Sequence, residues 1–216
     1  MNPPQFQRIG PPNVRLHSIL ELNSSYLNIM NKQKPSRAAS VGSALILLLL
    51  AVGCASGAKP EAMVPADFAV TTRHPFPVVV EVTGGKETNP LWKSDISSDA
   101  FEKAVEAAIR NTGVFSGIVD HSNATYRLDV KLVKVMTPNV GFDMTVTVVT
   151  EWRLVETRTG ATVFEEYITT PYTATVGDAF VAITRVRLAN EGAARDNIKE
   201  GIRRISDMSF TPPSGS

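Results

Sequence analysis

The sequence predicts an α+β fold, a two-layer sandwich in the order β-α-β-β-β-β-α with a mixed, mostly antiparallel sheet and two helices on one face. Three observations support this fold class. A valine-rich stretch at 77–83 precedes a capped helical pattern over 97–110, which is typical of a strand–helix–strand crossover. Alternating apolar and polar residues between 126 and 169 predict antiparallel strands, and a long helical pattern closes the domain.

The first strand and the first helix are bounded by clear local signals. Residues 77–83 are mostly β-branched and are followed by two glycines, which predicts a strand that ends in a turn. The helix predicted over 97–110 begins at Ser98 or Asp99, because either side chain can cap the first turn. Gly113 stands where a helix commonly stops in the left-handed conformation.

Four further strands are predicted before the last helix. Their ranges are 114–120, 126–132, 144–154 and 161–169. The turn-forming residues between the last two ranges predict a hairpin. Trp152 lies on the apolar face of its strand, so we expect it in the core.

The final helix is predicted from Asp178, as its cap, to about Asp207, with isoleucines at helical spacing in its second half. Gly192 and Gly201 each disfavour a helix by about 1 kcal/mol relative to alanine. They indicate either a close approach of the helix to the sheet or a break near Gly192. Two i,i+4 ion pairs are predicted on the solvent side, Glu191–Arg195 and Glu200–Arg204.

A secretory signal is predicted over residues 30–53. Three basic residues precede a short, wholly apolar run at 44–52, and small residues follow it. The run is shorter than the about 20 residues that a membrane-spanning helix needs. A buried core helix is the alternative, but such a helix would normally carry a polar stripe.

The segment Leu50-Ala-Val-Gly-Cys54 resembles the lipobox of bacterial lipoproteins. The resemblance implies that Cys54, the only cysteine, carries a diacylglycerol group and an N-acyl chain and becomes the first mature residue. We expect no other cofactor. Because Ala55 rather than aspartate follows the cysteine, the resemblance implies an anchor on the periplasmic face of the outer membrane, with the inner membrane as the less favoured address.

The chain is expected to hold one folded domain. Its predicted parts are an over-extended start or disordered segment at 1–29, with translation beginning at Met30, the signal at 30–53, a flexible tether at 54–73, the α+β domain at 74–210 and a disordered tail at 211–216. Five of the 22 basic and one of the 21 acidic residues precede Cys54, which leaves a net charge of −3 after cleavage. This balance argues against electrostatic binding to nucleic acid.

We expect the protein not to be an enzyme. The sequence lacks the closely spaced histidines and cysteines of a zinc site, a nucleophile motif and a glycine-rich phosphate loop. Glu165 and Glu166 are adjacent carboxylates, but on a strand they point to opposite faces. A hydrolase is the least favoured alternative.

Three residues are candidates for binding a partner. Trp92 lies in the loop between the first strand and the first helix, where an exposed indole could anchor a protein, although it could also cover the sheet edge. Arg185 and Arg187 lie near the start of the last helix and could form an exposed positive spot. A solvated helix face is the alternative for both arginines.

The mature chain as a whole resembles small periplasmic lipoproteins of Gram-negative bacteria. The likeness rests on the lipobox, on the strands that begin at 126 and contain Trp152, and on the closing helix with its segment 189–198. Auxiliary lipoproteins of ABC transporters and the lipopolysaccharide-assembly lipoprotein have a similar layout. The resemblance implies an accessory or binding protein of an envelope transport or assembly complex, and alternatively a carrier or chaperone for lipid or glycolipid. It leaves the oligomeric state open.

Overall fold

The computed structural model describes residues 56–66, 68–87, 95–138 and 141–209. The predicted signal peptide, Cys54, Trp92 and the tail at 211–216 lie outside the described residues, so the structure does not test the predictions made for them.

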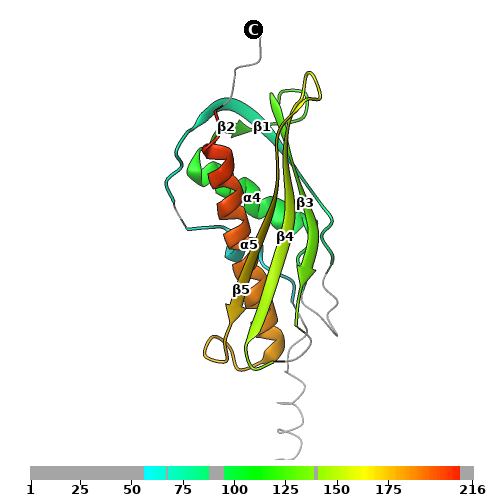
Figure 1. Cartoon of the computed structure of the whole chain (residues 1–216), viewed down its shortest axis with the longest axis vertical. Coiled ribbons are helices and arrows are strands. Elements are labelled where there is room, and N and C mark those ends of the chain that lie inside the picture. The colour runs from blue at the N-terminus through cyan, green and yellow to red at the C-terminus, as the bar shows by residue number, and fades with distance from the viewer. Residues whose placement is uncertain (1–55, 67, 88–94, 139–140, 210–216) are drawn as a thin grey trace, which may run out of the picture. The chain divides into compact units, whose positions relative to one another are not determined.

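A five-stranded mixed sheet forms one layer of the domain (Figure 1). Its strands are β1 (His74–Thr83), β2 (Phe115–Ile118), β3 (Tyr126–Met136), β4 (Met144–Glu156) and β5 (Thr162–Ala174). They lie in the order β2-β1-β3-β4-β5, with β1 parallel to both of its neighbours and the other pairs antiparallel. The predicted α+β class is therefore confirmed, as is the predicted order of the five strands along the chain.

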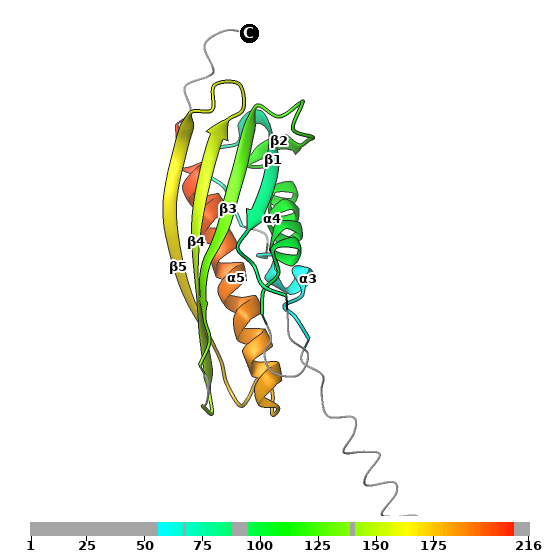
Figure 2. The same cartoon turned by 90° about the vertical axis from the view of Figure 1, so that its right-hand side faces the viewer.

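The helices form the second layer, on one face of the sheet (Figure 2). They are α3 (Pro60–Met63), α4 (Ser98–Thr112) and α5 (Ala182–Ser206). Helix α5 packs on β4 and β5, and α4 packs on β1 and β2. Between the layers lies one core, which includes Trp152 and Phe101 with no exposed surface. Trp152 is thus a core residue, as predicted.

Helix α4 is capped one residue earlier than expected. The side chain of Ser97 accepts a hydrogen bond from the backbone N–H of Ala100 at 3.2 Å, so Ser97 is the cap. Ser98 accepts instead from the N–H of Gly85 at 3.0 Å and ties the helix start to the turn after β1. Gly113 ends the helix with a φ of 63°, which confirms the predicted left-handed stop.

Helix α5 begins at Ala182, four residues after the predicted cap. Asp178 accepts hydrogen bonds from the backbone N–H and the hydroxyl of Thr175, at 2.7 and 2.9 Å, and so closes a turn before the helix. The helix is unbroken at Gly192 and Gly201. A Cβ at Gly201 would lie 2.6 Å from the Trp152 ring, and one at Gly192 would meet the ring of Tyr172. Both glycines therefore serve close approach of helix and sheet.

Residues 56–66 and 68–73 are packed against the domain, which corrects the prediction of a flexible tether for these residues. Met63 has no exposed surface and Ala58 is 7% exposed. The segment runs along α5 from the middle of its first half to its C-terminal end. We call these contacts the terminal seam. They are the hydrogen bonds Arg187–Ser56, Lys59–Glu191, Arg195–Ala62, Thr71–Ser206 and Thr71–Asp207.

Contacts of the terminal seam prevent one of the two ion pairs predicted on α5. Glu191 is 4% exposed and accepts a hydrogen bond from the backbone N–H of Lys59, while Arg187 lies 3.7 Å from it. The predicted pair of Glu191 with Arg195 is therefore wrong, because the α3 backbone takes up both side chains. The pair of Glu200 and Arg204 is confirmed at 2.7 Å, and the two arginines at 203 and 204 lower the pKa of Glu200 to about 2.

A polar cluster lies inside the core beneath α5. The side-chain oxygen of Asn197 accepts hydrogen bonds from the hydroxyl of Thr150 at 2.6 Å and from the indole N–H of Trp152 at 3.1 Å. Its amide donates to the carbonyl of Ile168 at 3.2 Å. All three polar side chains are fully buried. Asn197 thus joins α5 to both β4 and β5, and satisfies groups that would otherwise be costly to bury.

His74 gives the fold a dependence on pH. Its imidazole is buried at the start of β1, with Nε2 3.0 Å from the carbonyl of Ile205, and burial lowers its pKa below the usual 6.5. As the pH falls through 6.5, His74 takes up a proton in the unfolded chain before it does so in the folded protein. The free energy of unfolding that is present above pH 6.5 therefore decreases below this pH. We expect the urea midpoint of unfolding to fall below this pH and His74→Gln to reduce the fall. Equal pH profiles of the two proteins would contradict this.

Candidate functional site

The described residues contain no group of three or more metal-ligating side chains. Among the same residues, no helix is long and apolar enough to cross a membrane. The adjacent carboxylates of β5 are separated by the sheet. Glu166 forms an ion pair with Arg204 of α5, whereas Glu165 lies opposite Arg153 in register. These two carboxylates cannot act together on one substrate atom.

Arg185 and Arg187 do not form an exposed positive spot, so this interpretation is wrong. Arg185 is 6% exposed, and its guanidinium donates hydrogen bonds to the carbonyls of Ala179 and Phe180 at 2.8 and 2.7 Å. Arg187 donates to the hydroxyl of Ser56 at 2.9 Å. One arginine therefore organises the β5–α5 loop, and the other holds the first described residue of the domain.

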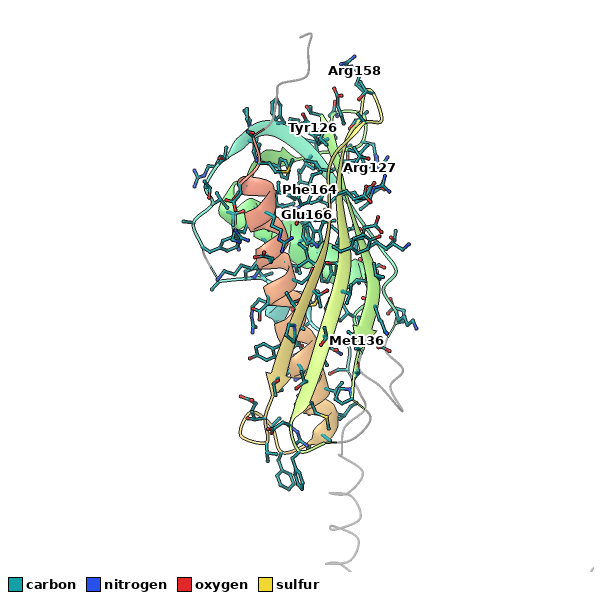
Figure 3. All side chains as sticks on the ribbon, viewed as in Figure 1. Tyr126, Arg127, Met136, Arg158, Phe164 and Glu166 are labelled. Carbon is teal, nitrogen blue, oxygen red and sulfur yellow. The ribbon has the colours of Figure 1, made fainter. Side chains whose placement is uncertain are left out.

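The side of the sheet that faces away from the helices is built from alternate strand residues. Successive strand residues alternate between the two sides, so Tyr126 of β3 points toward the helices while Arg127 points away (Figure 3). We call the side that faces away from α4 and α5 the outer face. It is formed by alternate residues of β1, β3, β4 and β5.

Charged residues occupy the half of the outer face near the β4–β5 turn. Two rows cross the sheet in register, Glu81–Asp129–Arg153–Glu165 and Thr83–Lys131–Glu151–Tyr167. With Arg127 they bring four carboxylates and three cationic side chains together. We call these residues the charged rows. The sequence already placed several of them on the polar side of their strands, but only the strand order shows that they form one surface.

Ion pairs hold the side chains at one edge of the charged rows. Arg127 donates two hydrogen bonds to Asp129, at 2.6 and 3.1 Å, and lies 3.6 Å from Glu81. These partners raise the pKa of Arg127 further. His121 lies 2.9 Å from the other oxygen of Glu81. The carboxylate of Glu151 raises the pKa of Tyr167, whose phenol is 60% exposed.

A shallow groove of about 280 Å³ crosses the charged rows. Its walls include the carboxylates of Glu81, Asp129 and Glu151 and the cationic groups of Lys131 and Arg153. Both signs of charge therefore lie within one groove, with Glu81 and Asp129 adjacent at one side and Lys131 and Arg153 next to carboxylates.

The other half of the outer face is rich in threonine. Thr145 and Thr147 of β4 lie opposite Thr173 and Pro171 of β5, and the hydroxyls of Thr145 and Thr173 are 2.8 Å apart. Met136 is 39% exposed beside them and also points outward (Figure 3). On β4 and β5 this half presents mostly short, uncharged side chains, while β3 adds Lys134 and Met136 beside them.

No protein-family model matches the sequence, and neither does any curated protein. Solved structures are similar to it in fold. A Xanthomonas campestris protein of the DUF330 family is 13% identical, with 63% of this chain and 92% of that one covered and a TM-score of 0.46. PelC from Paraburkholderia phytofirmans, a dodecamer, is 16% identical (64% and 91% covered, TM-score 0.42), and a minor lipoprotein from Acinetobacter baumannii is 10% identical (60% and 91%, 0.40).

Proposed function

We propose that this protein is a lipid-anchored accessory protein of a bacterial envelope complex, held on the periplasmic face of the outer membrane. The observation that carries the proposal is the lipobox-like segment Leu50–Cys54 placed directly before a folded domain. Only Ala55 separates Cys54 from Ser56, which is hydrogen-bonded to Arg187 of α5. Acyl chains on Cys54 would therefore hold the domain close to the membrane, without a long linker.

The anchor is tested by Cys54→Ser. We expect this change to abolish labelling by a fatty-acid analogue and to move the domain from the membrane to the soluble fraction, because serine provides no thiol for the lipid. Membrane fractionation and acyl labelling of the same cells are the measurements. Ala55→Ser is the matched control, since it keeps the thiol and changes only the neighbouring residue. A Cys54→Ser protein that keeps its label would overturn the proposal.

We further propose that the outer face binds the partner protein. It is free of any helix of the described domain, and its charged rows combine both signs of charge in a fixed register. Such a surface gives specificity through complementary charges. A lipid carrier would need an apolar groove, whereas three grooves formed by described residues, at Lys86, at Glu151 and at Asp120, are each lined in part by charged side chains. These linings favour protein binding over lipid transport.

A photo-reactive phenylalanine analogue tests the outer face. Placed at Tyr167, in the charged rows, it is expected to cross-link an envelope protein in living cells, identified by mass spectrometry. Lys103 is the matched control position, because its side chain is 61% exposed on α4, on the other side of the sheet. Equal cross-linking from both positions, or from Lys103 alone, would place the partner elsewhere.

A further inference from the structure

Two aromatic side chains are almost fully exposed at the end of the domain where α5 begins. Phe142, in the β3–β4 loop, is 86% exposed, and Phe180, in the β5–α5 loop, is 91% exposed. Val176 and Val181 add exposed apolar surface. The two loops are joined by a hydrogen bond of 3.4 Å from the N–H of Val176 to Asp143. We call Phe142, Val176, Phe180 and Val181 the aromatic tip.

Polar contacts hold the tip in place. Arg185, buried behind the β5–α5 loop, donates to the carbonyls of Ala179 and Phe180. Asp178 and Asp143 accept hydrogen bonds from the N–H groups of Thr175 and Val176. A buried arginine is thus used to fix the backbone that carries the most exposed aromatic ring. Transfer of these rings from water to an apolar environment is favourable, so their exposure indicates a surface that binds an apolar partner.

The terminal seam places Ser56, the first described residue, beside the first half of α5. Ser56 is bonded to Arg187, which lies five residues into α5, about 8 Å along the helix axis. The two residues from Cys54 to Ser56 can span at most about 7 Å. Acyl chains on Cys54 would therefore attach within about 7 Å of Ser56, nearer to the N-terminal end of α5, which carries the aromatic tip, than to its C-terminal end.

We propose that the aromatic tip inserts into the lipid leaflet that holds the acyl chains of Cys54. This proposal rests on the acylation proposed above. Aromatic side chains at the headgroup level are typical membrane-interface anchors. Insertion would direct the long axis of α5 away from the membrane and expose the outer face to partners in the periplasm. The contact is apolar, so it would resist added salt, unlike attraction to anionic lipids.

The test uses acylated protein in vesicles of phosphatidylethanolamine and phosphatidylglycerol with brominated acyl chains, which quench nearby indoles. Phe180→Trp is expected to lose most of its added fluorescence in brominated vesicles, at low and high salt alike. Tyr167→Trp, on the outer face, is the matched control and is expected to stay unquenched. The unsubstituted protein gives the background of Trp92 and Trp152.

Acyl labelling of each sample distinguishes failure of membrane insertion from failure of the proposed lipid anchor. If the protein carries no acyl label or does not bind the vesicles, the proposal of a lipid anchor on Cys54 is contradicted. In labelled, vesicle-bound protein, an unquenched Phe180→Trp indole overturns insertion. The indole could instead be shielded because two copies of the protein associate through the aromatic tip. A dimer that Phe142→Ala disrupts would show this, would overturn insertion, and would assign the tip to contact with a second copy.

Discussion

Gly201→Ala is expected to lower the free energy of unfolding by about 3 kcal/mol, measured by urea denaturation. The added methyl group would lie 2.6 Å from the Trp152 ring. The ring cannot move aside easily, because it is fully buried and its N–H is hydrogen-bonded to Thr150 and Asn197. The whole of α5 would have to shift away from β4. This strain exceeds the gain in helix propensity from replacing a glycine, which is about 1 kcal/mol.

Gly117→Ala is the matched control for this change. Gly117 lies in β2, and no heavy atom would lie within 4 Å of its new Cβ. We expect the control to unfold at nearly the same urea concentration as the unsubstituted protein. If Gly201→Ala were as stable as Gly117→Ala, the packing of α5 on Trp152 would be looser than the distances indicate.

Asn197→Ala is expected to cost about 2 to 3 kcal/mol of unfolding free energy. It removes the acceptor for Thr150 and Trp152 and the donor for the Ile168 carbonyl, and leaves a cavity between α5 and the sheet. The Trp152 N–H keeps its hydrogen bond to Thr150. The Thr150 hydroxyl, however, loses its short bond to Asn197, and the Ile168 carbonyl loses the amide donor in a buried site, which is costly.

Thermal and urea unfolding of Asn197→Ala and Asn111→Ala provide the comparison. Asn111 is exposed in α4, so its replacement should change stability by only a few tenths of a kcal/mol. A similar, small effect at both positions would mean that the buried amide contributes little. Asn197→Asp is a further check, because it keeps the acceptor oxygens but places a carboxylate in the core.

The sequence predicted the fold because its patterns are local. Alternation over 144–154 and helical spacing around Ile198 each report which side of an element is buried. Short connections pair β3, β4 and β5, whereas the place of β1 between β2 and β3 was not predicted. The exact caps were harder to predict, since Ser97, Ser98 and Asp99 are all good capping residues. Only the turn after β1, which engages Ser98, selects Ser97 as the cap.

The errors come from contacts between distant parts of the chain. Residues 56–73 are rich in small residues and prolines and show no period, yet Met63 is buried by α5 and α4. Arg185 was expected at the surface because its partners are backbone carbonyls, which no side-chain pattern reveals. The aromatic tip had a weak signal: Phe142 and Phe180 each stand beside a turn and outside any apolar period.

The terminal seam also sets an order on how the domain can fold. Each of its hydrogen bonds joins residues 131 to 136 positions apart, so these contacts wait for α5 and its C-terminal cap, whereas Ala58 also donates a backbone hydrogen bond to Asp95 before α4. By contrast, β3, β4 and β5 pair through short connections. Because synthesis proceeds from the N-terminus, these five hydrogen bonds can form only after the sequence of α5 has been made. Closure of the terminal seam is therefore a late step in folding, and it joins the first described residues to the last helix.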